Sequence, residues 1–332
     1  MHSRAMNTPP LSLPDRMPAP RSDSVHLVQL PDERRLAYTE YGDRLGYPLF
    51  HFHSHGSCRL EAAALHQVAK RSGFRIIAVD RPGVGLSDPH RANSADAFAQ
   101  DLEVLATQLR CRQYGLIACG GGLASALAFA ARSGQRASML LGMSCSLPCT
   151  AERKGLFRNL LCALVQRLVQ GVIVLRHWRG AAALQARVQR FVDAMPYADR
   201  RMFENPAVMQ LLTMDITEAL RQGAGGVASD TVQQFEPLQV NLSALTLPCE
   251  FWLGSADSVS VRQRTENLMG LLPNARMHPL ANRGRYFYLR HADEVFARAN
   301  QVLGRAANAV VHQADFAFRR AVHENRMVAA TR

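Results

Sequence analysis

The chain has 332 residues, of which 48% are apolar and 20% charged, and its formal net charge is +12. These fractions are typical of globular proteins and exclude a mostly disordered chain. A chain of this length is expected to form one large domain with an insertion, or two domains. All but two of the 39 basic residues are arginines, which favours bidentate contacts with carboxylates or phosphates. No DNA- or RNA-binding motif accompanies the charge, so no nucleic acid partner is expected.

The cysteines and the apolar stretches show whether disulfides, a zinc site or a membrane span are to be expected. The seven cysteines are scattered without a C-x-x-C pair, which indicates neither a disulfide framework nor a zinc ribbon. Residues 1–24 are rich in proline and are expected to form a disordered tail. The longest apolar stretch, 160–175, is interrupted by Gln166, Arg167 and Gln170 and is too short and polar to span a bilayer. The sequence therefore predicts a cytoplasmic protein without a transmembrane segment.

Strands and helices are predicted to alternate along most of the chain. Short apolar runs between turn residues predict strands, and apolar residues at helical spacing predict helices. In chain order, the predicted elements are strands at 25–30, 35–41 and 48–53, a helix at 60–71, a strand at 75–80, a helix at 96–109, a strand at 114–119 and a helix at 123–133. Helical patterns dominate 148–239, and a strand at 249–253, a helix at 262–271, a strand at 275–279 and a helix at 292–303 follow. This alternation predicts a mostly parallel central sheet flanked by helices.

Four regions carry a resemblance to a known superfamily. They are HFHSHGSCRLE at 51–61, VDRPGVGLSD at 79–88, LIACGGGLASALAFA at 116–130, and the pair LGSADSVSV at 253–261 and NRGRYFYLRHADEV at 282–295. In this order they resemble the α/β-hydrolase superfamily, in particular a bacterial branch with a cap. The resemblance implies an α/β-hydrolase core at 25–147 and 240–304 and a helical cap inserted at 148–239. Outside the resemblance, residues 305–332 are predicted to form a C-terminal helical extension.

The resemblance also implies which positions would carry a catalytic triad. The nucleophile of a G-x-S-x-G turn corresponds to Gly120, which has no side chain. The base corresponds to Arg285, whose guanidinium stays protonated and cannot accept a proton, while His291 matches a second, helix-starting histidine. Asp257 matches the acid. The triad is therefore degenerate, and no standard route to acyl transfer is expected.

Other residues could replace the missing chemistry. Cys119 as nucleophile would place Ile117 where the turn needs a small residue, so a buried cysteine is the favoured interpretation. His51, His53 and His55 alternate along one strand and could bind a metal, but a further ligand is lacking and His53 already has a place in the oxyanion-hole loop. No metal and no cofactor are therefore expected.

The pairing of Asp257 with Arg285 has two interpretations. An ion pair between them would lock two loops together, or the guanidinium would receive an acidic ligand in the old substrate cavity. The ion pair is favoured, because a buried carboxylate without a partner is costly.

The sequence predicts a non-catalytic protein of α/β-hydrolase fold that binds a small, partly apolar ligand or a regulatory partner. The superfamily includes receptors that have lost a triad member, which gives this prediction a precedent by resemblance. Two alternatives stay open: a hydrolase or lyase that acts on a small ester or acyl substrate through non-standard residues, and an interaction module that docks a protein through the basic cap or the 305–332 extension. The predicted ligand-binding residues are His53, His55, Cys119, Gly120, Gly121, Asp257 and Arg285.

Overall fold

The computed structural model describes residues 25–92, 94–145, 180–233 and 238–304, together with positions 164, 167, 168, 171 and 172. The predicted tail at 1–24, the extension at 305–332 and most of the arginine-rich first half of the predicted cap lie outside the described residues. Within the described part of the chain, no helix is both long and apolar enough to cross a membrane.

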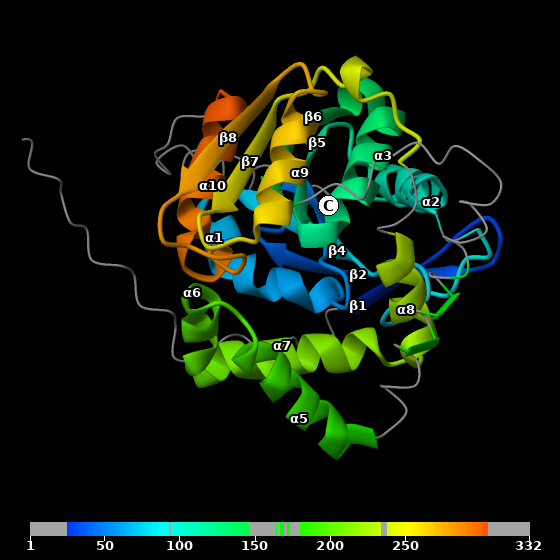
Figure 1. Cartoon of the computed structure of the whole chain (residues 1–332). Coiled ribbons are helices and arrows are strands. Elements are labelled where there is room, and N and C mark those ends of the chain that lie inside the picture. Colours follow the sequence, from blue (N-terminus) through cyan, green and yellow to red (C-terminus); the bar gives the residue numbers. More distant parts are fainter. Residues whose placement is uncertain are drawn as a thin grey trace, which may run out of the picture.

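An eight-stranded sheet runs through the centre of the molecule, in the order β1-β2-β4-β3-β5-β6-β7-β8 (Figure 1). The second strand is antiparallel to both of its neighbours, and the remaining pairs are parallel. The strands are β1 (Val25–Gln29), β2 (Arg35–Gly42), β3 (Tyr47–Phe52), β4 (Phe74–Val79), β5 (Tyr114–Cys119), β6 (Ala137–Met143), β7 (Cys249–Gly254) and β8 (Ala275–Leu280). The predicted fold class, with its mostly parallel sheet, is confirmed.

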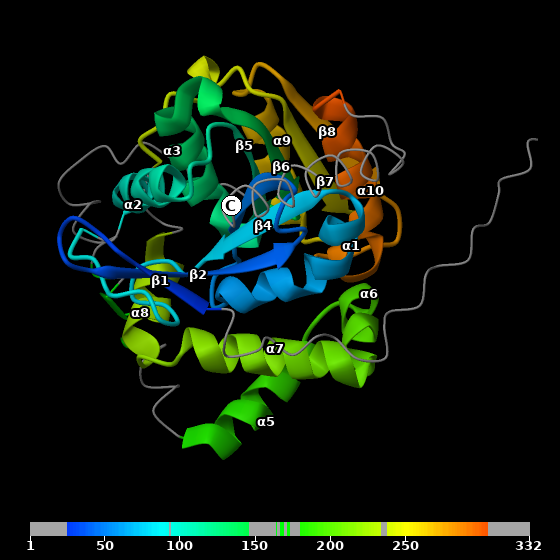
Figure 2. The same cartoon turned by 180° about the vertical axis from the view of Figure 1, so that it is seen from behind.

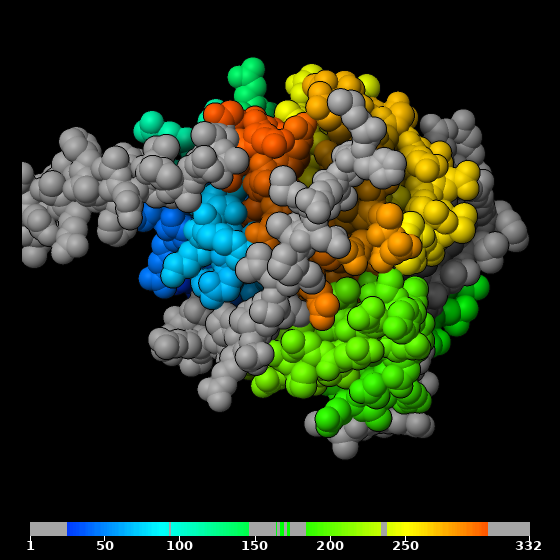
Figure 3. All heavy atoms as spheres, turned by 90° about the vertical axis from the view of Figure 1, so that its left-hand side faces the viewer, coloured from blue at the N-terminus to red at the C-terminus, as the bar shows by residue number. Residues whose placement is uncertain are grey.

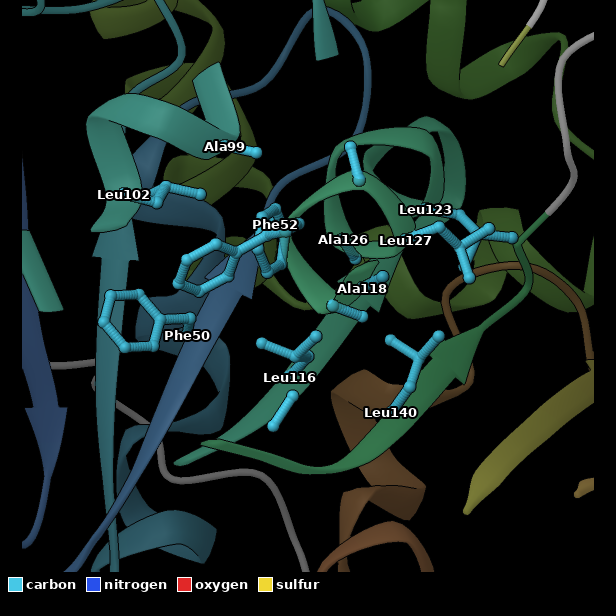
Figure 4. Packing of buried hydrophobic residues seen from close by; sticks show 14 of the residues in the cluster. Phe50, Phe52, Ala99, Leu102, Leu116, Ala118, Leu123, Ala126, Leu127 and Leu140 are labelled. Atoms are coloured by element: carbon cyan, nitrogen blue, oxygen red, sulfur yellow. The ribbon is translucent and has the colours of Figure 1, made fainter. Parts of the chain in front are cut away.

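Helices cover both faces of this sheet (Figures 1 and 2). On one face the core includes residues of α2 (Ala95–Gln108), α3 (Leu123–Ser133) and α9 (Val259–Met269). Phe50 and Phe52 of β3 lie there with Leu116 and Ala118 of β5, as Figure 4 shows. On the other face, α1 (His66–Arg71) and α10 (Tyr288–Val302) complete a second core. Burial on both faces explains why the central strands are continuous apolar runs.

Several elements differ from the sequence prediction. The predicted helix at 60–71 is a 3-10 helix, Arg59–Leu65, followed by α1, and α9 begins at Val259 rather than at residue 262. The sequence pattern does not predict strand β6, because its run ASMLLGM is apolar without alternation and periodicity alone does not identify such a strand. Helix α10 consists of two helical segments that meet at a kink at His291, where φ is −123° and ψ is 22°. The segment before the kink is not predicted from the sequence, whereas the segment after His291 corresponds to the predicted helix at 292–303.

Among the residues described between β6 and β7, four α-helices form a layer at one end of the molecule, and we call them the cap helices (Figures 1 and 3). They are α5 (Gly180–Asp193), α6 (Tyr197–Arg200), α7 (Pro206–Ala219) and α8 (Ala224–Val232). Helix α7 begins at Pro206, and the side chain of Asn205 accepts a hydrogen bond from the backbone N–H of Ala207. It packs on the 3-10 helix η2 (Arg59–Leu65), which follows β3. The cap helices thus cover the loop that the sequence assigns to the oxyanion hole.

Candidate functional site

The turn after β5 is built from three glycines, and each has a different surrounding. Gly120 has a φ of +49°, in the left-handed region that favours glycine. A Cβ atom on Gly122 would overlap the backbone carbonyl of Phe52, so this position must stay glycine for β3 and α3 to approach. A Cβ atom on Gly121 would overlap the imidazole of His55. The chain therefore makes the sharp strand-to-helix turn of the superfamily, with bare backbone at its tip.

Arg285 takes the space in front of that tip. A Cβ atom built on Gly120 would lie 2.6 Å from Nη2 of Arg285 and 3.1 Å from Oγ of Ser54. The backbone N–H groups of Arg285 and Tyr286 donate to the carboxylate of Asp199, at 3.1 and 2.8 Å, which fixes the base of the side chain. The guanidinium carbon lies 5.7 Å from the ring centroid of Tyr286. The space that a side chain on Gly120 would enter is thus occupied by a cation.

The favoured ion pair between Asp257 and Arg285 is not found, since no nitrogen–oxygen distance of 4 Å or less joins them. Instead, Oδ2 of Asp257 accepts hydrogen bonds from Oγ of Ser144 at 2.9 Å and from the backbone N–H of Gly254 at 3.0 Å. Burial raises the pKa of the Asp257 carboxyl despite these bonds. Within the described residues, the guanidinium of Arg285 has neither an ion pair nor a hydrogen bond. The predicted ion pair is wrong: Oδ2 of Asp257 is bound by two neutral donors, and Arg285 faces Gly120 instead.

The three alternating histidines have different environments. The buried ring of His53 lies with Nδ1 2.9 Å from the carbonyl oxygen of Ser54, and its Nε2 accepts from the backbone N–H of Arg81 at 3.3 Å. Burial lowers the pKa of His53 well below its ordinary value. The ring of His55, in contrast, lies against Gly121, with Nδ1 3.3 Å from Asp230. His53 is therefore a core residue, whereas His55 reaches the site.

His51 belongs to a separate buried cluster with Cys119 and Glu61. Its Nε2 lies 3.5 Å from Sγ of Cys119 and 3.6 Å from Oε2 of Glu61. These donors lie close enough to hold a metal ion together. However, Nδ1 of His51 is buried without a hydrogen-bond partner, whereas a ligating histidine almost always has one on its second nitrogen. We therefore interpret the cluster as a polar part of the core.

Carboxylates of the cap helices hold the oxyanion-hole loop. Asp215 of α7 accepts from Oγ of Ser57 at 2.6 Å and from the backbone N–H of Cys58 at 3.0 Å. One helical turn further on, Glu218 accepts from Nη2 of Arg59 at 2.6 Å. Burial, and next the charge of Glu61, raise the pKa of Asp215 to about 7. Sequence reasoning missed these contacts, since more than 150 residues separate the partners.

Asp230 of α8 makes the third such contact. Its carboxylate accepts from Nε and Nη2 of Arg81 at 2.5 and 2.8 Å. The same guanidinium donates to the carbonyl oxygens of His53 and Ser54 at 2.6 and 3.0 Å. Burial alone would raise the pKa of Asp230, but the charges of Arg81 and His55 lower it. The Arg81 charge is fully paired, unlike that of Arg285.

Two cavities meet at this site. One of about 400 Å³ lies under the cap helices and is lined mainly by apolar side chains, including Leu184, Phe203 and Leu212. The other, of about 250 Å³, is more polar and is lined by residues that include Gly120, Asp257 and Arg264. The residues that line both cavities are His55 and Arg285. These two side chains therefore stand at the boundary between an apolar and a polar compartment.

The predicted ligand-binding residues divide into two groups. Those that line the polar cavity are His55, Gly120, Gly121, Asp257 and Arg285. The other two, His53 and Cys119, are at most 1% exposed and line neither cavity. Burial raises the pKa of Cys119 well above that of a free thiol, which keeps it protonated. Five of the predicted residues thus line one cavity at the turn after β5, and the sequence does not indicate the walls of the apolar cavity.

Comparison with known proteins shows which family the chain resembles. A family model described as serine aminopeptidase, S33, matches residues 51–280. A curated relative, polyketide synthase ThaQ from Burkholderia thailandensis, is 28% identical over 225 residues, which cover 66% of this chain and 10% of that protein. The chain thus spans about a tenth of the length of that relative.

Solved structures share the fold at low sequence identity. A malate-bound thermophilic esterase from Thermogutta terrifontis has a TM-score of 0.63 at 20% identity, over 84% of this chain and 97% of its own. A hydrolase from Pseudomonas aeruginosa reaches 0.66 at 17% identity, over 86% and 100% of the two chains. An enol-lactonase from Burkholderia xenovorans reaches 0.64 at 16% identity, over 84% and 100%. At such identities the similarity shows the fold alone.

Proposed function

The chain belongs to the serine aminopeptidase S33 family of α/β-hydrolases, and we propose that it binds a small, partly apolar ligand without hydrolysing it. The observation that carries this proposal is the position of Arg285 against Gly120. Gly120 has no side chain that could attack a substrate. The group in front of the turn is the guanidinium of Arg285, a cation that cannot act as a base.

The size and lining of the cavity under the cap helices support the binding of a small molecule. The volume of about 400 Å³ under the cap helices lies within the range of small-molecule sites, and its apolar walls suit an aliphatic or aromatic group. The similarity to a segment of a polyketide synthase supports a ligand derived from acyl units, because polyketides are built from such units.

The hydrolase alternative fits the family and its fold neighbours, and it requires another nucleophile. Four serines line the cavities. Ser57 donates to Asp215 and Ser144 donates to Asp257. The hydroxyls of Ser54 and Ser125 have no hydrogen bond to a histidine among the described residues, so neither has a base to activate it. The thiol of Cys119 lies near His51, but it is buried and reaches neither cavity. These contacts favour binding over hydrolysis.

Ester turnover tests the proposal. The full chain is incubated with p-nitrophenyl esters from acetate to decanoate, beside the Asp257→Ala variant. We expect both proteins to release p-nitrophenol no faster than buffer. Turnover by the wild-type chain that is lost in Asp257→Ala would overturn the non-catalytic function.

Thermal shifts with small-molecule fractions of cell extracts test whether the chain binds a ligand. A fraction that contains the ligand should raise the melting temperature of the native chain, because the ligand binds only the folded state. The control is Leu212→Trp, which fills part of the apolar cavity and should reduce the shift. A shift that is equal in both proteins would place the ligand elsewhere.

A further inference from the structure

We propose that the ligand is a singly charged carboxylate with an apolar chain, whose carboxylate binds the guanidinium of Arg285 and whose chain lies in the cavity under the cap helices. This inference rests on the non-hydrolytic binding proposed above and adds the chemical class of the ligand.

The first support is the unsatisfied hydrogen-bonding capacity of Arg285. A guanidinium has five N–H donors, and among the described residues none of these has a hydrogen-bond acceptor. The fully buried arginines of this region differ, since Arg59 contacts Asp80 and Glu218, and Arg81 contacts Asp230. A carboxylate matches the planar fork of a guanidinium with two parallel hydrogen bonds.

The second support is that the neighbouring carboxylates have other partners. Glu61 accepts from the backbone N–H of Ser54 at 2.9 Å and from the hydroxyl of Tyr288 at 3.3 Å. Asp257 accepts from Ser144 and Gly254. Neither lies within 4 Å of Arg285, so the guanidinium is open to a ligand.

These same carboxylates select the charge of the ligand. The single positive charge of Arg285 can neutralise one negative charge of a ligand, and the nearby charges of Glu61 and Asp257 would then repel a second. A monoanionic carboxylate is therefore favoured over a phosphate monoester, which carries up to two negative charges.

The third support is the place of Arg285 between the two cavities. Arg285 lines the polar cavity together with Gly120 and the apolar cavity together with Tyr288 and Leu289. A ligand bound there has its charged end at Arg285 and its chain among Phe203 and Leu212. The arrangement fits an amphipathic acid.

Paired probes test the inference on the full chain. Hexanoate, octanoate and decanoate are titrated calorimetrically, each beside its uncharged amide and, for eight carbons, beside octyl phosphate. At the best chain length we expect the carboxylate to bind about tenfold or more tightly than the amide, because a hydrogen bond to a charged group is lost in the amide. Octyl phosphate is expected to bind more weakly than octanoate.

Variants test whether the preference for a carboxylate over an amide depends on Arg285. Arg285→Gln should bring the ratio of carboxylate to amide affinity close to one, Arg285→Lys should retain part of it, and Leu212→Trp should weaken both probes alike. The control is Arg276→Gln, which removes an exposed arginine that lines neither cavity and should leave the ratio unchanged.

Three results would overturn the inference: equal binding of carboxylate and amide by the wild-type chain, an unchanged ratio in Arg285→Gln, or no binding of any carboxylate in the series. The ratio of carboxylate to amide affinity is measured on the wild-type chain, so this test remains valid even if Arg285→Gln fails to fold. Ester turnover would instead overturn the proposed function, so the two failures are distinguishable.

Discussion

Nη2 of Arg285 lies 2.6 Å from the position that a Cβ atom on Gly120 would take. In a serine hydrolase of this fold, a nucleophile at this turn faces the base. Here the turn has no side chain, and the residue at the base position fills the space that it leaves. The missing side chain at Gly120 and the position of Arg285 are therefore geometrically linked, and under the proposed function a standard acyl-transfer mechanism would need both residues to be changed.

Restoring the two residues tests this link. The double variant Gly120→Ser with Arg285→His should hydrolyse p-nitrophenyl acetate slowly, because the imidazole of His55 still lies against Gly121. Adding His55→Gly should raise kcat at least about tenfold, since an oxyanion donor contributes roughly a hundredfold or more in established enzymes. Steady-state kinetics of both variants measure this. Equal rates would mean that His55 does not obstruct the turn.

The glycines of the turn should differ in their tolerance of a side chain. Gly122→Ala places a Cβ atom against the backbone of Phe52 and should cost about 3 kcal/mol of stability. Gly120→Ala places a Cβ atom against the far end of the Arg285 side chain, on a left-handed backbone, and should cost about 1–2 kcal/mol. Denaturant unfolding of the two variants measures the difference. A larger loss at Gly120 would contradict the packing of the turn.

The buried pair of Asp230 and Arg81 should be important for stability. Asp230→Asn leaves a buried guanidinium without its counter-ion and should cost about 3–5 kcal/mol. Asp293→Asn breaks the half-exposed pair with Arg71 and should cost under about 1 kcal/mol. Thermal melts of both variants compare the two pairs, and similar losses would show that Arg81 finds other acceptors.

The pH dependence of stability should show the titration of Asp215. Its pKa in the folded chain is about 7, above that of an unfolded aspartate, so the folded state binds the proton more tightly. The stability that this proton provides is full below about pH 4 and is lost as the pH rises toward 7. Asp215→Asn removes this loss, and its melting temperature relative to the wild type should therefore rise between pH 5 and pH 8. A difference that stays constant across this range would contradict the assignment.

Much of this structure could be predicted from sequence, because local patterns set it. The run from Tyr114 to Cys119 and the small residues that follow define β5 and its turn without any tertiary information. The cap contacts are different, since the pairing of Asp230 with Arg81 joins residues 149 apart. No local pattern indicates which acid meets which arginine. The same limit explains the incorrect pairing of Asp257 with Arg285, because the competing donor, Ser144, lies 113 residues from Asp257.

No residue of this chain is expected to act as an acyl-transfer nucleophile at the turn of Gly120. Intact-protein mass spectrometry after incubation with a fluorophosphonate probe tests this expectation most directly, with a serine esterase as the positive control. We expect no added mass on this chain when the esterase is fully labelled. A stoichiometric adduct on a serine or cysteine that lines either cavity would contradict the non-catalytic function.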